Sequence, residues 1–248
     1  QGMVLLDGAK MSKSKGNLVE FSEQLHSHGA DAVRVALLFS GPVEDDIDWK
    51  DVSTTGAAKF LARAWRVAQD VATGPGADPA GGDQTVRRVT HRLLADAPGL
   101  IEATKFNVVV ARLMDLVNVT RKAIDSGAGA ADPAVREAAE VIATVLDLFA
   151  PYTAEDMWEL LGHSGSVGLV EWKSPEPGLL VDELVTAVVQ IGGKVRASLE
   201  VPADIGADAL EARALAVRRV QHQLEGKQVM KVIVRAPKIV SIAVKPLG

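Results

Sequence analysis

The chain has 248 residues, of which 48% are apolar, 24% charged and only 4% aromatic, and its formal net charge is −5. The absence of cysteine excludes disulfides, thiolate zinc sites and cysteine catalysis, and no apolar run reaches the ~18 residues needed to cross a bilayer. We therefore expect a globular cytoplasmic protein without a membrane segment, in which a core of Ala, Val and Leu favours closely packed helices.

The first distinctive segment is rich in lysine and serine and reads Lys10-Met11-Ser12-Lys13-Ser14-Lys15-Gly16-Asn17. Gly and Asn tolerate turn and left-handed conformations, so we predict a mobile loop here, with Asn17 available to cap the next element. Ammonium groups act as point charges on phosphate, while hydroxyls and backbone amides add hydrogen bonds. The segment is typical of a polyanion site, and the plain alternative is a solvated surface loop.

A buried helix is predicted next, at about residues 29–39. Val33 and Leu37 fall at helical spacing, and Asp31 supplies an acid in the first turn. The dipeptide Gly41-Pro42 then ends the helix.

An acidic turn follows, with carboxylates at Asp45, Asp46 and Asp48. Three carboxylates could bind a divalent ion, but the stretch has neither a glycine-spaced loop nor a distal glutamate. We therefore predict no metal site, and favour turn formation and pairing with basic residues.

The middle of the chain predicts a helical bundle whose members are joined by Gly- and Pro-rich connections. Asp132-Pro133 is typical of a helix start, and Thr153 with Asp156 resembles a capping box. The expected helices lie at about residues 52–73, 83–100, 106–126, 133–149 and 151–161.

The last part of the chain changes to a strand pattern. Gly192-Gly193 is a hairpin signal between two strand-like runs. We expect a ββαββ module of about 65 residues, with strands at 184–190 and 194–201, a helix at 207–223, and strands at 229–234 and 239–244.

The predicted fold is therefore mainly α with a small α+β domain. We expect three parts, namely residues 1–50 with the loop, residues 51–178 with the helical bundle, and residues 179–248 with the small module. Residues 184–248 carry ten Lys and Arg against five Asp and Glu, so the small module is basic although the whole chain is acidic. His91 lies beside arginines, and it either faces a phosphate or is a partly buried helix histidine.

The residues then point to a family. The string Lys10 to Ser14 resembles the second signature of class I aminoacyl-tRNA synthetases, and the order of the Gly29-Ala30-Asp31 helix, Gly41-Pro42 turn and bundle resembles their leucyl, isoleucyl and valyl branch. The stretch 189–196 is similar to the start of the C-terminal domain of bacterial leucyl-tRNA synthetases, and residues 224–227 and 231–234 resemble its later part. Two departures are Gly192, which replaces a commoner Asn or Lys, and Ala197, which stands where the family often has an acid.

This resemblance implies a loop segment, an anticodon-binding-type helical bundle and a C-terminal module that binds tRNA. It implies ATP with Mg²⁺, leucine and tRNA(Leu) as substrates and partners. In the loop it implies catalytic roles for Lys10 and Lys13, and ATP contacts from Lys10, Met11, Ser12, Lys13 and Ser14. Candidate tRNA contacts are Arg63, Arg66, Arg87, Arg88, Lys194, Arg196, Lys227 and Lys231.

The family's upstream His-x-Gly-His-type signature does not occur around any of the five histidines. The resemblance therefore implies a missing N-terminal catalytic half, as in a fragment or one chain of a split enzyme, and we expect this chain alone to be inactive. Two alternatives stay open: a valyl- or isoleucyl-type fragment, and a non-catalytic RNA-binding paralogue that kept the fold. The absence of a Cys-rich tail opposes the first, and the intact loop opposes the second.

Overall fold

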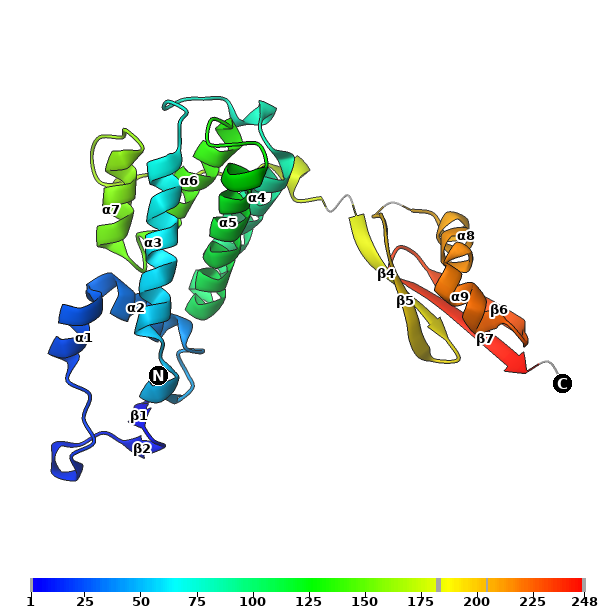
Figure 1. Cartoon of the computed structure of the whole chain (residues 1–248), viewed down its shortest axis with the longest axis horizontal. Helices are drawn as coiled ribbons and strands as arrows, with labels where there is room; N and C mark the ends of the chain where they lie inside the picture. Colours follow the sequence, from blue (N-terminus) through cyan, green and yellow to red (C-terminus); the bar gives the residue numbers. More distant parts are fainter. Residues whose placement is uncertain (1, 182–183, 204, 247–248) are drawn as a thin grey trace. The chain divides into compact units, whose positions relative to one another are not determined.

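A computed structural model describes residues 2–181, 184–203 and 205–246. The chain divides into two compact units, residues 1–180 and 181–248 (Figure 1). The first unit is helical and the second combines strands with helices, which confirms the predicted fold class of a mainly α protein with a small α+β domain. None of the helices in the described ranges is long and apolar enough to cross a membrane.

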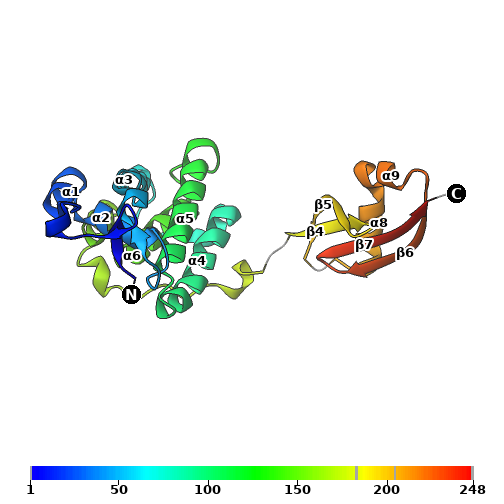
Figure 2. The same ribbon diagram turned by 90° about the horizontal axis from the view of Figure 1, so that it is seen from below.

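The first unit is a helical bundle with one central helix, α6 (Pro133–Leu146), of which nearly every residue is buried. Figure 2 views this bundle from below. Four helices pack against α6, namely α3 (Thr54–Asp70), α4 (Gln84–Glu102), α5 (Phe106–Ser126) and α7 (Pro151–Leu160). A fifth, α2 (Ala30–Phe39), lies outside these helices and packs against α3, α5 and α7.

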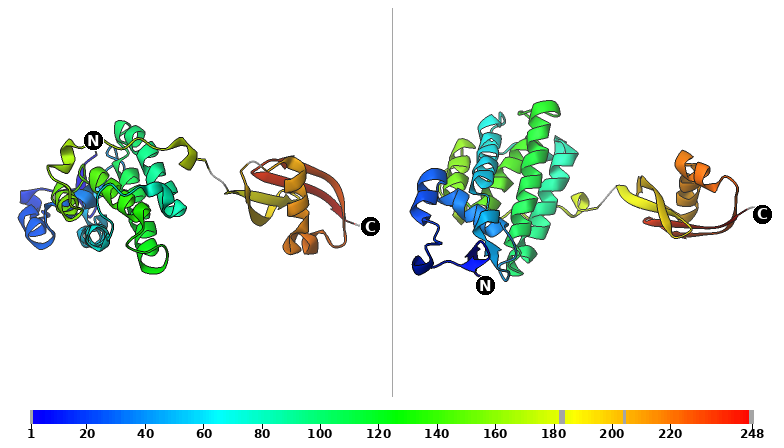
Figure 3. Two further views of the ribbon diagram at one scale, coloured as in Figure 1. Left: turned by 90° about the horizontal axis from the view of Figure 1, so that it is seen from above. Right: turned by 60° about the horizontal axis from the view of Figure 1, so that its bottom comes forward.

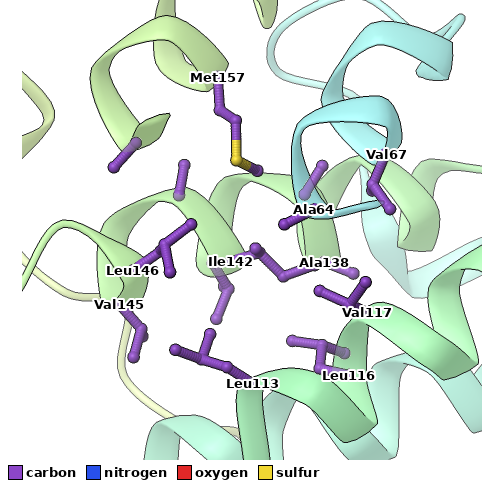
Figure 4. Packing of buried hydrophobic residues seen from close by; sticks show 14 of the residues in the cluster. Ala64, Val67, Leu113, Leu116, Val117, Ala138, Ile142, Val145, Leu146 and Met157 are labelled. Atoms are coloured by element: carbon purple, nitrogen blue, oxygen red, sulfur yellow. The ribbon is translucent and has the colours of Figure 1, made fainter. Parts of the chain in front are cut away.

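Small side chains let the neighbouring helices approach α6 closely. Ala138 of α6 is completely buried, and Figure 4 labels it between Ala64 of α3 and Val117 of α5. Ile142, also completely buried, lies between Leu113 of α5 and Met157 of α7. α2 packs against α3 and α5 and contributes Ala32 to the same core. Residues on the two sides of position 50 therefore share one hydrophobic core.

The start of α7 differs from the predicted capping box, which was wrong. The helix begins at Pro151 after Ala150, and the carboxylate that accepts from its first turn belongs to Asp31 of α2. Asp31 Oδ2 accepts from both Thr153 N and Thr153 Oγ1, each at 2.7 Å. A distant carboxylate thus satisfies donors that a local Asp156 was expected to share.

The N-terminal region contains regular structure that the sequence did not predict. A small sheet has the strand order β2-β1-β3, formed by β1 (Val4–Leu6), β2 (Ala9–Lys10) and β3 (Ile47–Asp48), and α1 (Phe21–His28) follows the lysine-rich loop. Strands of two or three residues are too short to show a period-2 pattern. The β1–β2 pair is local, whereas β3 joins β1 from far along the chain, with Val4 opposite Ile47.

The second unit is a four-stranded sheet with helices on one face (Figure 3). The strand order is β5-β4-β7-β6, with β4 parallel to β7 and an antiparallel hairpin on each side. The predicted single helix is divided at Val217, which has an extended backbone (ψ 119°). The elements are β4 (Leu184–Ile191), β5 (Lys194–Pro202), α8 (Ala207–Ala216), α9 (Arg218–Leu224), β6 (Lys227–Arg235) and β7 (Ile239–Pro246).

We predict that Leu146→Ala destabilises the first unit by about 2–5 kcal/mol, because Leu146 is completely buried and truncation leaves a cavity. Leu148→Ala is the matched control, since Leu148 is 45% exposed and should cost less than about 0.5 kcal/mol. All four tryptophans lie in residues 1–180, so tryptophan fluorescence during urea unfolding reports on this unit alone. Equal losses in the two variants would contradict the central position of α6.

Candidate functional site

The lysine loop (residues 10–17) joins β2 to α1 and extends away from the helices (Figures 1 and 3). It contains one 3-10 turn, η1 (Lys13–Lys15). Ser12 Oγ accepts from Lys15 N at 3.3 Å, and Gly16, with φ at 66°, donates its N–H to Lys13 O. The turn is therefore capped at both ends, while Lys13 and Lys15 stay exposed.

Asn17 is not a cap for the next element, which corrects that prediction. Its Oδ1 accepts from Ser12 N at 2.9 Å, and its Nδ2 donates to Lys10 O at 3.2 Å. The amide therefore brackets Met11 and joins the two ends of the lysine loop through backbone atoms.

The base of the lysine loop is a tight turn at Asp7 and Gly8, both of which have positive φ (52° and 70°). Asp48 lies across from this turn, and its carboxylate accepts from Gly8 N at 2.6 Å and Asp7 N at 3.2 Å. Desolvation raises the pKa of Asp48, but hydrogen bonds from Gly8, Lys50 and Asp7 lower it more, so the pKa lies below its usual value.

The acidic turn has the structural role that was favoured for it. Asp46 Oδ1 accepts from Met3 N at 2.6 Å, and Asp48 also pairs with Lys50 at 3.6 Å. These carboxylates bind backbone donors and a cation, which confirms the prediction of turn formation and basic pairing.

Two of the predicted RNA contacts, Arg63 and Arg66, are exposed on α3 beside α5. Arg63 donates a hydrogen bond to Asn118 Oδ1, and Arg121 of α5 donates to Arg66 O and pairs with Asp70. Side chains from both helices thus form one polar surface with a basic component. Arg88 is half-buried on α4.

Arg87 has a different environment, so its assignment to an RNA surface was wrong. It is only 4% exposed, and its guanidinium pairs with Glu137 at 3.3 Å and with Glu176. His91, one turn further along α4, is completely buried, and its Nδ1 accepts from Glu176 N at 3.0 Å. Neither side chain can reach a phosphate at the surface.

His91, Glu137 and Glu176 are the one group in the described ranges with atoms close enough together for a metal ion. The same carboxylates already bind cations, because Glu137 accepts from Arg87 and from Lys173 at 2.7 Å. His91 Nε2 approaches Glu137 Oε1 at 3.3 Å without hydrogen-bond alignment. The arginine and the lysine supply the positive charge that a metal would bring.

In the second unit the four predicted cations do not share one surface. Strand alternation places Lys231 on the sheet face opposite the helices, whereas Lys227 donates to Gln223 O of α9 at 2.9 Å. Lys194 lies at the tip of the β4–β5 hairpin, and Arg196 stands at the register shift of β5.

The residues that accompany Lys231 were missed as site candidates. We define the open face of the sheet as Gln190, Lys231, Ile233, Arg235, Ser241 and Lys245, which strand register places together opposite the buried face. Ser241 Oγ donates to Gln190 Oε1 at 3.4 Å across β7 and β4. The period-2 spacing of residues 231, 233 and 235 could have identified this face.

Family models match two stretches of the chain, one at the start of the first unit and one that begins in its bundle and continues into the second unit. Residues 83–211 match the anticodon-binding domain of tRNA ligase, which is more than half of the chain, and residues 1–50 match tRNA synthetases class I (I, L, M and V). The second match contains the entire lysine loop.

Whole-chain comparisons agree with these models. A leucine–tRNA ligase of Leifsonia xyli is 62% identical over 99% of this chain, and one of Arthrobacter is 60% identical over 98%. The chain spans less than a third of these relatives, 28% and 29% of their lengths. A LeuRS of Agrobacterium radiobacter, solved with tRNA and LeuAMS, has the same fold (TM-score 0.80, 24% identity, 99% of this chain and 33% of that one).

We predict that Glu137→Gln destabilises the first unit by about 3–5 kcal/mol, since it leaves the buried Arg87 without full charge compensation. Glu44→Gln is the matched control: its pair with Lys105 is at the surface, and the urea midpoint should not change. Tryptophan fluorescence follows both variants. A Glu137→Gln protein as stable as the parent would show that the network contributes no net stability.

Proposed function

The chain belongs to the tRNA ligase family through its anticodon-binding domain, and on that premise we propose that it is the C-terminal part of a leucine–tRNA ligase. It supplies a loop that acts on ATP and two surfaces that hold tRNA(Leu). The proposal rests on one observation. The lysine loop is exposed, its 3-10 turn is capped at both ends, and it belongs to the same compact unit as the helical bundle. We propose the cytoplasm as the location of this reaction.

Two steps make up the proposed reaction. A carboxylate oxygen of leucine attacks the α-phosphate of ATP, the bond to the β-phosphate breaks, and pyrophosphate leaves. A hydroxyl of the terminal tRNA ribose then attacks the leucyl carbonyl, and AMP leaves. Mg²⁺ enters with ATP as part of that substrate.

The lysine loop acts in the first step. In the transition state the attacking and the leaving oxygen are both partly bonded to the α-phosphorus, and negative charge increases on the phosphate oxygens. The exposed ammonium of Lys13 stabilises this charge, while Lys10 and the hydroxyls of Ser12 and Ser14 contact the triphosphate. Met11, which is half-buried, is proposed to contribute to the same ATP contact.

The remaining parts of the site belong to the rest of the enzyme. The relatives are more than three times as long as this chain, so the adenine and leucine pockets are proposed to lie outside it. Consistent with a covered surface, several large apolar side chains near the beginning of the chain are exposed, namely Met3, Leu18, Phe21 and Phe39. This chain alone should not form leucyl-adenylate.

Two surfaces are proposed to bind tRNA by its backbone rather than by its base edges. In the first unit the surface contains Arg63 and Arg66 on α3. In the second it is the open face, where Lys231, Arg235 and Lys245 surround a polar and apolar centre. Cations distributed over a sheet suit phosphates along an RNA surface.

We predict that Lys13→Ala in the full-length enzyme slows adenylate formation by about 10²- to 10³-fold, the usual effect of removing one transition-state charge stabiliser. The KM for ATP should change much less, because the contact strengthens as charge develops. Leucine-dependent ATP–pyrophosphate exchange measures both. Lys122→Ala, an exposed lysine on α5, is the control and should retain the parental rate; an unchanged rate for Lys13→Ala would contradict the proposed role.

We predict that Lys231→Glu/Arg235→Glu weakens tRNA binding by at least about tenfold and lowers the slope of log affinity against log salt by about one per residue. Adenylate formation should not change. Arg213→Glu/Arg219→Glu makes the same change in charge on the helices covering the other face. If the two double variants lose the same affinity, net charge rather than the open face governs binding.

A further inference from the structure

Two side chains outside the reacting groups determine the shape of the lysine loop. Asn17 joins its two ends, as Oδ1 accepts from Ser12 N at 2.9 Å and Nδ2 donates to Lys10 O at 3.2 Å. Asp48 holds the turn that precedes Lys10, with Oδ2 2.6 Å from Gly8 N and Oδ1 3.2 Å from Asp7 N.

In the loop and its base both side chains bind only backbone atoms, and Asp48 additionally accepts from Lys50 N at 3.2 Å and pairs with the Lys50 ammonium at 3.6 Å. The lysine side chains of the loop take no part in these bonds and stay exposed. The backbone is held in two places: Asp48 holds the turn before Lys10, and Asn17 holds the stretch from Lys10 to Ser12. Between Ser12 and Gly16 the 3-10 turn then sets the direction of Lys13. No buried residue lies in the loop itself, so packing does not fix it.

We propose that Asn17 and Asp48 are positioning residues, which hold the lysine loop in the form that presents Lys13 to the α-phosphate of ATP. This inference rests on the proposed function of the loop. A preformed loop loses less conformational entropy in reaching the transition state. Substituting Asn17 or Asp48 should therefore change the rate of adenylate formation more than the affinity for ATP.

Different replacements of Asn17 separate the hydrogen bond that its oxygen accepts from the one that its nitrogen donates. Asn17→Ala removes both hydrogen bonds. Asn17→Asp keeps an acceptor for Ser12 N but replaces the donor to Lys10 O with an oxygen that repels that carbonyl. For Asp48, Asn retains one carbonyl acceptor for the turn and Ala retains none, so a graded loss is expected.

The test uses the full-length enzyme and single-turnover adenylate formation. We expect Asn17→Ala, Asn17→Asp and Asp48→Ala each to slow the step by about tenfold, with a small change in the KM for ATP and an unchanged urea midpoint by tryptophan fluorescence. Asp48→Asn should lose less. Asp45→Asn, in the same acidic turn but outside these contacts, should match the parent.

A double-mutant cycle shows whether Asn17 acts through Lys13. In the Lys13→Ala background, Asn17→Ala should cost less than about twofold, because the group it positions is gone. A full tenfold loss in that background, or parental rates for Asn17→Ala, would overturn the inference and leave the role of Lys13 intact. An unsubstituted enzyme without leucine-dependent exchange would instead overturn the proposed function.

Discussion

Helix α6 is surrounded by other elements, and two charged residues in its first half, Arg136 and Glu137, are buried at 4% and 3% exposure. A buried charge is costly unless opposite charges and hydrogen bonds compensate it. Arg136 pairs with Glu140 one turn further along α6 at 2.9 Å, but the other partners of Arg136 and the cations that pair with Glu137 come from elsewhere in the sequence. This requirement determines the course of several connections around the bundle.

Apart from Glu140 of α6 and Arg87 of α4, the partners named here are in segments with little regular structure. Arg136 donates to Thr73 O at 2.6 Å and to Leu161 O at 2.5 Å, and so fastens the connections after α3 and α7. Glu137 accepts from Lys173, while Arg87, which also pairs with Glu137, binds Glu176. The segment before the second unit is thus held to the bundle by charge as well as by apolar packing.

The elements that could be predicted from the sequence are those that depend on local residue patterns. The features that were not predicted depend on contacts between distant parts of the chain. The predicted helix at 106–126 was confirmed because its apolar residues repeat regularly, and Asp132-Pro133 begins α6 as predicted because cap and first-turn chemistry is local. The two hairpins of the second unit were also predictable from strand patterns, the first of them together with the turn signal Gly192-Gly193. In contrast, the β1–β3 pairing and the Asp31 cap of α7 join residues far apart in the chain.

The candidate site shows the same division. The lysine loop could be recognised because its residue types are contiguous, but Arg87 and Arg88 could not be separated by composition. Neighbours on a helix point about 100° apart, so one of two adjacent arginines can be buried while the other is not. Arg87, His91 and Leu94 do follow the buried stripe of α4, and this spacing was the available signal. The partner that makes burial tolerable, Glu137, lies 50 residues away.

The two charged systems are built for different purposes. Around α6 the charges are buried, so their partners must remain in place and the helices are fixed with them. At the lysine loop the corresponding contacts are hydrogen bonds to backbone atoms, one part-buried and one exposed, which are individually weak and can reform. A loop held in this way has a preferred shape without being rigid. That combination suits the proposed reaction, in which ATP has to enter, its α-phosphate reacts and pyrophosphate leaves.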